Sequence, residues 1–128
     1  MEEAFRAILL ATSGVTSIAT SGRINFGSHP QGAAYPAIVL NTIDDSGGHT
    51  LTGADGLAVG RVQVDCYADI YGAAKLLSRA ALAALNAYQG GNFSGIFHAG
   101  SRDGREGGSN EADRPYRVSL DFITNWRD

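Results

Sequence analysis

The chain has 128 residues, of which 44% are hydrophobic and 18% charged, with one Cys and a formal net charge of −3. Its length and apolar content predict one globular domain over residues 1–128 and exclude a wholly disordered chain. A single Cys excludes an internal disulfide framework and a Cys-based zinc ribbon. The apolar runs are shorter than the roughly 20 residues of a membrane span, and the acidic start lacks the basic region of a signal peptide. We therefore expect a protein made in the cytoplasm with no membrane partner.

The charge balance limits the partners. An isoelectric point near 5.5 disfavours a protein that binds nucleic acid over its whole surface. Of the ten basic residues only Lys75 is a Lys, and the other nine are Arg. Arg side chains hold carboxylates by paired hydrogen bonds at subunit contacts, which is one explanation of this excess. A GC-rich coding sequence, which also accounts for the many Ala and Gly residues, is the simpler one.

The first half of the chain alternates between helical and extended patterns. Phe5, Ile8 and Leu9 fall on one side of a helix that Gly14 would end. Further on, a short apolar run after Pro36 carries the β-branched residues typical of a strand. The elements predicted in chain order are a helix over 2–12, a loop or turn over 15–22, a short strand over 23–27, a break over 28–32 and a strand over 36–43.

The second half contains the clearest strand and the longest helix. Residues 57–67 alternate between polar and apolar side chains, with Val62, Val64 and Cys66 on the apolar face. An Ala-rich helix follows, and two glycines at 90–91 end it. The elements predicted in chain order are a Gly-rich loop over 44–56, a strand over 57–67, a helix from 68 or 69 to about 88, a strand over 93–99, a Gly-rich loop over 100–115 and a strand over 116–126.

Together these elements predict an α+β fold, in which a mostly antiparallel β-sheet is packed on one face with two α-helices and connected by long Gly-rich loops. The two loops are too polar to bury much apolar surface, so we expect them to be mobile in a free monomer and to become ordered on assembly. This hypothesis predicts that deletion of residues 103–112 leaves a folded monomer that no longer assembles.

The sequence lacks the motifs of common catalytic sites. The P-loop, the nucleophile elbow and the dinucleotide-binding fingerprint are missing, and the three His are too far apart for a metal-ligand motif. Cys66 lies on the apolar face of a strand, where a thiol behaves as a small buried hydrophobic group. Asp65 and Asp121 lie on outward faces of two strands and could form a carboxylate pair, although cross-strand pairing with Arg is the more ordinary arrangement. The Arg residues available for that pairing are Arg61 and Arg117. We expect no catalytic residue, no cofactor and no metal site.

Three features favour a surface used for assembly. One strand presents a polar face that mixes charge and amide groups, two Gly-rich loops project from a small core, and tyrosines gather near strand and helix ends, where their amphipathic rings suit interfaces. An ordinary solvated surface would explain each feature alone. These tyrosines are Tyr35, Tyr67, Tyr71 and Tyr116. The candidate residues for contact with another subunit or partner are His49, Asp55, Arg61, Gln63, Asp65, Arg102, Arg105, Glu106, Glu111 and Arg117.

Several segments occur in an order that matches a known family. An N-terminal helix is followed by the apolar segment 36–40, and the segment 61–67, Arg-Val-Gln-Val-Asp-Cys-Tyr, runs into an Ala-rich helix that opens at 71–75. The chain closes on the alternating segment 116–122. In this order the chain resembles the tail-completion (tail-terminator) family of long-tailed phages and phage-like gene transfer agents. The resemblance covers nearly the full length, and the loop 100–115 contributes nothing to it.

The resemblance implies a structural virion protein and not an enzyme. Members of this family form a ring, expected to be hexameric, at the head-proximal end of the tail tube, where they stop tube polymerisation and present a surface to the neck. The implied partners are other copies of the chain, the tail tube protein and a neck or head-completion protein, with DNA passing through the lumen without specific recognition. Such a protein is made in the cytoplasm of a bacterial host and ends in the virion.

Two other interpretations stay open on the sequence. A head-closure or adaptor ring of the neck shares the small size, the α+β content and assembly through loops, and differs in its place in the particle. A small α+β enzyme or ligand-binding oligomer would hold its site between sheet and helix. That last interpretation predicts that His98 and an acid such as Asp65 face one cavity.

Overall fold

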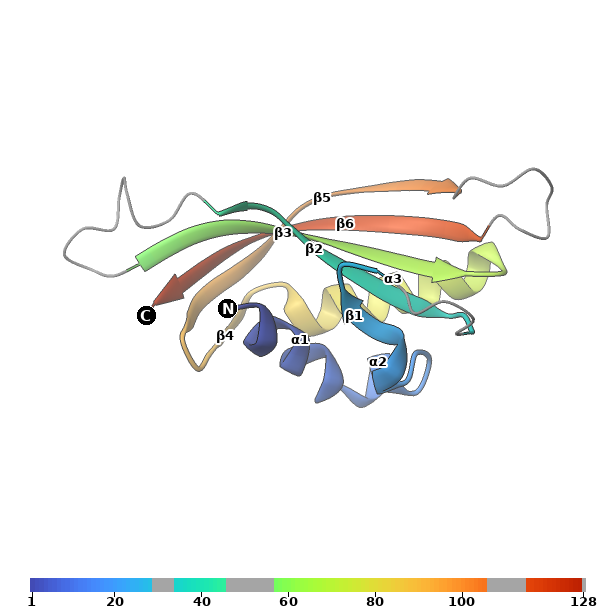
Figure 1. Ribbon diagram of the computed structural model, residues 1–128, viewed down its shortest axis with the longest axis horizontal. Helices are drawn as coiled ribbons and strands as arrows, with labels where there is room; N and C mark the ends of the chain where they lie inside the picture. The colour runs from blue at the N-terminus through green and yellow to red at the C-terminus, as the bar shows by residue number, and fades with distance from the viewer. Residues whose placement is uncertain (29–33, 46–56, 106–114, 128) are drawn as a thin grey trace.

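The computed structural model describes residues 1–28, 34–45, 57–105 and 115–127. These residues form helices and strands that confirm the predicted α+β class (Figure 1). In chain order the elements are α1 (Glu2–Leu10), α2 (Ser13–Thr16), the 3-10 helix η1 (Ser21–Arg23), β1 (Ile24–Phe26), β2 (Ala37–Asp45), β3 (Leu57–Ala68), α3 (Tyr71–Leu85), β4 (Tyr88–Gly90), β5 (Phe93–Arg105) and β6 (Tyr116–Arg127).

The strands form one six-stranded sheet in the order β1-β2-β3-β6-β5-β4. β1 runs parallel to β2, and the other neighbouring pairs are antiparallel, so the sheet is mixed. The longest pairing joins β3 to β6 without a register shift, from Leu57 opposite Arg127 to Ala68 opposite Tyr116. Because side chains alternate between the two faces along a strand, this pair keeps one set of side chains on each face over its full length.

The helices α1, α2 and α3 lie on one face of the sheet, and no described helix or strand covers the other face (Figure 1). The core fills the space between the helices and the sheet. Phe5 of α1 and Leu77 of α3 pack in one buried cluster with Val64 of β3 and Phe122 of β6, and all four side chains are fully buried. The sheet face toward the helices is therefore apolar, and the opposite face is left for solvent or a partner.

The long helix is shorter than predicted at both ends. β3 continues to Ala68, so α3 begins at Tyr71 instead of at residue 68 or 69. At the other end Ala87 has a φ of 64°, which turns the chain out of the helix, and β4 follows at once. The sequence also predicted two α-helices, whereas α2, of four residues, is a third and lies partly in the predicted loop 15–22. Elements of three or four residues are too short to show a period in the sequence.

β5 is longer than predicted. The sequence predicted a strand over 93–99 and a loop over 100–115, but residues 100–105 continue β5 opposite β6. Pairing with the regularly alternating β6 outweighs the low strand preference of Gly100 and Gly104. A deletion of residues 103–112 would therefore remove residues 103–105 from the end of β5. The other predicted loop residues, 46–56 and 106–114, lie outside the described residues.

The two edge strands of the sheet are short. β1 and β4 have three residues each, and they pair with only the first part of β2 and of β5. Beyond that part, no described strand lies on the outer side of β2 or β5. A register shift interrupts each of these open stretches, between Thr42 and Asp44 in β2 and between His98 and Gly100 in β5.

Candidate functional site

The face of the sheet opposite the helices gathers polar side chains from neighbouring strands. We call it the uncovered face and define it by Gln63 and Asp65 of β3 and by Ser119 and Asp121 of β6. Gln63 lies opposite Asp121, and Asp65 lies opposite Ser119. Because directly opposite residues of an antiparallel pair point to the same face, these side chains come within reach of one another.

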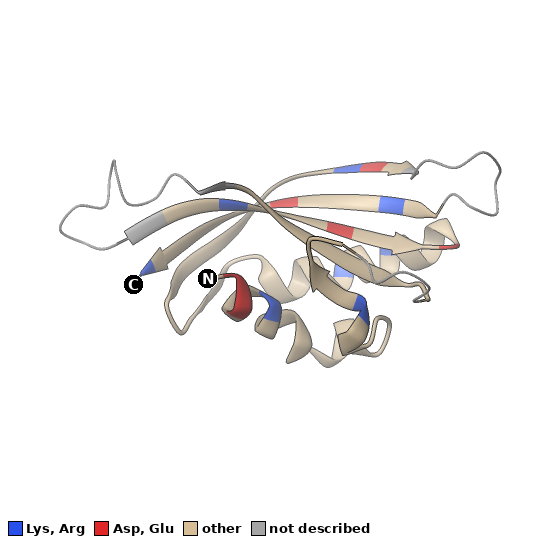
Figure 2. Cartoon of the chain, viewed as in Figure 1, with Lys and Arg blue, Asp and Glu red and all other residues tan. Residues whose placement is uncertain are grey.

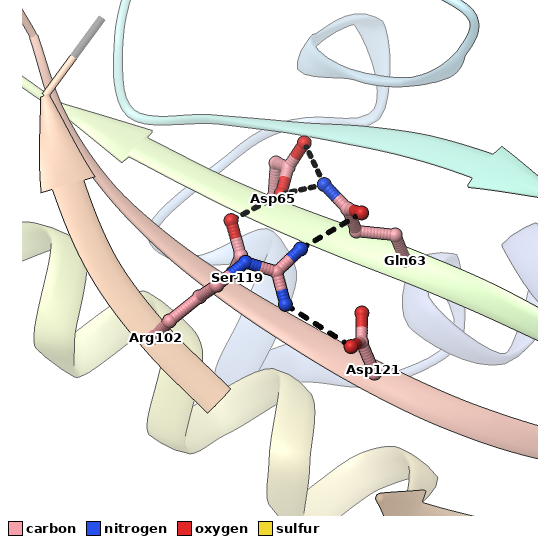
Figure 3. A network of polar contacts seen from close by, with 5 residues as sticks. All are labelled: Gln63, Asp65, Arg102, Ser119 and Asp121. Atoms are coloured by element: carbon pink, nitrogen blue, oxygen red, sulfur yellow. Dashed lines mark hydrogen bonds and ion pairs between the residues drawn. The ribbon is translucent and has the colours of Figure 1, made fainter. Parts of the chain in front are cut away.

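Five side chains of this face form one hydrogen-bonded network (Figure 3). The Ser119 hydroxyl donates to Oδ1 of Asp65 over 2.6 Å, and the Gln63 amide donates to the two oxygens of Asp65 over 2.9 and 3.0 Å. The Gln63 carbonyl oxygen accepts from Arg102 over 3.1 Å, and the same guanidinium meets Asp121 at 3.1 Å. This five-residue network joins β3, β5 and β6 through their side chains.

Asp65 is buried although it lies on the uncovered face. Its exposed fraction is 5%, whereas the side chains of Asp121 and Arg102 are 20% and 54% exposed. The sequence predicted that Asp65 and Asp121 point outward and meet Arg61 or Arg117 across strands. The structure instead pairs Asp121 with Arg102, and the Asp65 carboxylate accepts its hydrogen bonds from neutral side chains.

A pocket of about 290 Å³ lies beside Asp65, toward the β1–β2 edge of the uncovered face. The rings of Tyr35 and Tyr67 stand at its side with their centroids 6.2 Å apart and their planes inclined by 44°. Arg23 steadies one wall, because its Nη1 donates to the carbonyl oxygen of Tyr35 over 3.4 Å. The residues that line the pocket are Gly27, Ser28, Tyr35, Val39, Asn41, Asp65 and Tyr67. Aromatic rings and a buried carboxylate therefore border one small cavity.

Apolar side chains are exposed on another part of the uncovered face. Phe97 of β5 is 46% exposed, and Ile123, directly opposite on β6, is 37% exposed. Gly95 leaves room for the Phe97 ring, since a Cβ at Gly95 would lie 2.5 Å from it. Exposed apolar side chains bordered by polar ones are typical of surfaces that bind other proteins.

A second polar cluster joins β5 to α3 on the helix side of the sheet. The Asp103 carboxylate accepts a hydrogen bond from the Tyr71 hydroxyl over 2.6 Å and from Lys75 Nζ over 3.1 Å. The Tyr71 ring also meets the Tyr116 ring edge-on, with centroids 5.8 Å apart. These contacts hold the far end of the β5–β6 hairpin over the first turn of α3.

Replacing Asp103 is expected to change how stability depends on acid pH. Hydrogen bonds from Tyr71 and Lys75 lower the pKa of Asp103 below its usual 3.8, so the folded state favours the charged carboxylate. The resulting contribution to stability is complete at neutral pH and is lost as the pH falls below 3.8. Asp103→Asn should therefore lower the urea unfolding midpoint slightly at pH 7, since the Asp103–Lys75 pair lies at the surface, and its difference from the wild type should shrink as the pH falls below 3.8. Equal midpoints at pH 7 would contradict the assignment.

The predicted contact residues differ in where the structure places them. Arg61 is exposed on the uncovered face outside the five-residue network, and Arg117 is half-buried opposite Gly104, where an added Cβ would come within 3.1 Å of its Nη2. Gln63, Asp65 and Arg102 belong to the network itself. The predictions that lie outside the described side chains concern His49, Asp55, Arg105, Glu106 and Glu111.

Cys66 and His98 occupy the helix side of the sheet. Cys66 is a fully buried free thiol, as predicted, and burial, with a smaller effect of the Asp65 charge, raises the pKa of the Cys66 thiol. Such a thiol is not a nucleophile at neutral pH. His98 lies opposite Phe122 of the core, with the two ring centroids 5.6 Å apart. Asp65 is on the uncovered face, so His98 and Asp65 do not share the cavity that a ligand-binding interpretation required.

The sequence analysis did not include Ser119 or Asp103 among the candidate contact residues, and it placed Asp121 on an outward face without including it among them. The alternation along 116–122 would have placed Ser119 and Asp121 beside Gln63 and Asp65 if the register of β3 and β6 had been known. Asp103 lies in a segment that the sequence predicted to be a loop, and a loop residue cannot be assigned to a face. Strand order was therefore the missing information in each case.

Comparison with known proteins identifies the family. The sequence profile of the family described as "Tail completion protein gp17" matches residues 3–125, which extend from α1 into β6. The chain belongs to the tail completion protein gp17 family. The resemblance seen in the order of the sequence segments is thereby confirmed. None of the curated proteins matches the chain.

A solved structure shares the fold of this tail completion protein. It is a chain of an assembly described as "Virion of native gene transfer agent (GTA) particle", with a TM-score of 0.76 and 18% sequence identity. The superposition covers 100% of this chain and 95% of that chain. Family membership makes the present chain a structural protein of a virion tail and not an enzyme. Within the described parts of the chain, no helix has both the length and the apolar surface that a membrane crossing requires.

Proposed function

We propose that six copies of this tail completion protein form a closed ring at the head-proximal end of the tail tube. The ring ends growth of the tube and offers a surface to which the neck of the capsid binds. The observation that carries the proposal is the family match over residues 3–125, because the name of the family refers to the completion of a tail. Six copies are expected from the symmetry of the tube that the family resemblance implies.

The fold supplies what a closed ring needs. Each copy in a ring must offer two different surfaces that fit each other, so that contacts repeat head to tail and close after a full turn. The uncovered face, with its five-residue network and exposed Phe97 and Ile123, is one such surface. The layer of helices on the opposite side of the sheet is a second and chemically different one (Figure 1).

The proposed partners follow from this position in the particle. They are other copies of the chain, the tail tube protein and a neck or head-completion protein. DNA passes through the lumen without being recognised, since a chain with a net charge of −3 carries no excess of basic groups to hold phosphates. The described residues proposed for contact between copies or with partners are Arg61, Gln63, Asp65, Arg102 and Arg117.

Particles made without this protein test the proposal. We expect filled heads without attached tails, together with tails whose tubes vary in length, and we expect the wild-type chain supplied separately to restore normal particles. Electron microscopy gives the tube lengths and the fraction of joined particles. Tails of uniform length still joined to heads would contradict the proposal.

The mass of the purified chain, measured by light scattering with and without tail tubes, tests the ring itself. A closed ring of six copies on the tube supports the proposal. If instead the protein is found only on isolated heads, it is an adaptor of the neck. If it remains a small dimer that does not bind the tube, it is neither a tail-tube ring nor a neck adaptor.

A further inference from the structure

The pocket beside Asp65 has the chemistry of a site for a cationic side chain. Asp65 is 5% exposed, and its carboxylate accepts hydrogen bonds from the Ser119 hydroxyl and the Gln63 amide, both neutral groups. A buried carboxylate of this kind is stabilised by a cation that reaches it. The nearest guanidinium of the network, that of Arg102, bonds Gln63 and Asp121 instead.

Asp65 also retains hydrogen-bonding capacity toward the pocket. A carboxylate has about four acceptor positions, and the described residues donate three hydrogen bonds to Asp65, two to Oδ1 and one to Oδ2. The oxygen that is turned away from Ser119 points toward β2, the strand that carries the pocket residues Val39 and Asn41 (Figure 3). A donor inside the pocket can therefore complete the coordination of Asp65.

The shape of the pocket selects a guanidinium. Its volume of about 290 Å³ is at the lower limit of small-molecule sites, roughly 300–1,000 Å³, and suits a single side chain. The rings of Tyr35 and Tyr67 border the same space. Arg combines a planar cation that stacks on aromatic rings with several donors in a fork that fits a carboxylate.

Among the described arginines, two are available to enter the pocket of another copy. Among the arginines whose side chains are described, Arg61 and Arg79 are exposed and have no hydrogen bond or ion pair with another described residue. Arg61 lies on the uncovered face itself, so its insertion would bring two uncovered faces together and close a dimer. Arg79 lies on α3, in the helix layer on the other side of the sheet, and its insertion would repeat head to tail.

The surface around Arg79 fits such a contact. Gly72, Leu76, Arg79 and Ala83 recur at helical spacing on the exposed side of α3, and Leu76 is 58% exposed. Small residues at both ends of this stripe let another surface approach the helix closely, and Leu76 adds an apolar contact one turn before the cation. Within its bounds α3 has basic residues, Lys75 and Arg79, and no acidic ones (Figure 2). Its charge is therefore complementary to the Asp65 carboxylate.

We propose that Arg79 of one copy inserts its guanidinium into the pocket of the next copy, bonds the Asp65 carboxylate and stacks on the rings of Tyr35 and Tyr67. The contact rests on the proposed ring and specifies which surfaces of neighbouring copies meet: the exposed stripe of α3 and the uncovered face. Repetition of this contact around the ring would neutralise the buried carboxylate of every copy.

Neutralising each partner in the full-length chain tests the contact. The concentration at which rings form is measured by light scattering, in the presence of tail tubes if the wild type needs them, for Arg79→Gln, Asp65→Asn and the double variant. Truncation of one partner of a buried ion pair should raise this concentration about tenfold or more. The double variant should form rings at a concentration no higher than that of the more strongly impaired single variant, because both substitutions remove the same interaction.

Arg61→Gln is the comparison variant, since it removes an equally exposed guanidinium that lies on the uncovered face itself. Whatever contact Arg61 makes elsewhere, this substitution should raise the ring-forming concentration clearly less than Arg79→Gln does, because Arg61 cannot enter the pocket of the next copy in a head-to-tail repeat. Arg79 is exposed on the helix, so Arg79→Gln should fold as the wild type does and can carry the test if Asp65→Asn does not fold. Three results would overturn the contact while leaving the proposed ring intact. Arg79→Gln could form rings at the wild-type concentration, or Arg61→Gln could raise that concentration as much as Arg79→Gln does. In the double variant, the increases caused by Arg79→Gln and Asp65→Asn could multiply, which would show that the two residues act independently. A wild-type chain that forms no ring, with or without tubes, would overturn the ring and this contact together.

Discussion

Phe122→Ala is expected to lower the free energy of unfolding by about 3–5 kcal/mol. Phe122 projects from the middle of β6 into the core and is fully buried. Its ring meets that of Phe5 at a centroid distance of 6.4 Å, so it links the sheet to α1. The substitution removes apolar surface from the core and leaves a cavity that the rigid β3–β6 pair cannot close. Urea unfolding followed by circular dichroism gives the value.

Ile123→Ala is the matched control for that substitution. Ile123 is the next residue of β6, faces the opposite side of the sheet and is 37% exposed. Its removal should cost less than about 1 kcal/mol in the monomer, because little additional apolar surface is lost from the folded state. Similar losses for Phe122→Ala and Ile123→Ala would mean that the core does not lie between the sheet and the helices.

Asp65→Ala is expected to destabilise the monomer by about 1–3 kcal/mol. The Ser119 hydroxyl, whose residue is 1% exposed, would lose its acceptor and remain a buried unpaired donor, and the Gln63 amide would lose two contacts. Asp65→Asn should cost less, since the amide keeps one oxygen that can accept from Ser119. Thermal unfolding of the two variants beside the wild type measures the difference.

The control for this substitution is Asp121→Ala at the exposed end of the same network. Asp121 contacts an Arg102 side chain that is 54% exposed, and ion pairs of this kind contribute about 0–1 kcal/mol. The expected order of destabilisation is therefore Asp65→Ala first, with Asp121→Ala well below it. The reverse order would show that the network is held by its surface ion pair and not by its buried carboxylate.

Regular burial made part of the fold predictable from the sequence. In β3 and β6 apolar and polar side chains alternate, and the predicted ends, 67 and 126, differ from Ala68 and Arg127 by one residue. The middle of α3 was predictable because Leu77, Ala81 and Leu85 recur at helical spacing. β4 and the last part of β5 were not, because their Gly-rich segments have little preference of their own and owe their structure to pairing with a neighbouring strand.

The candidate site was predictable only in its first strand. The polar alternation of Arg61, Gln63 and Asp65 was enough to predict that β3 has one polar face. The burial of Asp65 was not predictable, because it depends on Ser119 and on Gln63, which Arg102 in turn orients from the far side of β6. These partners come together only because the strands lie in the order β3-β6-β5. Strand order depends on contacts between distant segments, so it cannot be predicted from a local sequence pattern.

The bulges in β2 and β5 interrupt strands at the two sides of the sheet. Each bulge lies in the stretch where the short strand β1 or β4 has ended, and there the longer strand is the outermost of the described strands. A bulge breaks the regular spacing of backbone donors and acceptors, so another copy cannot continue the hydrogen-bond ladder there, and indefinite fibre-like growth is suppressed. In the proposed ring, recognition between copies is thereby left to side-chain surfaces, whose fit can fix both the choice of partner and the number of subunits.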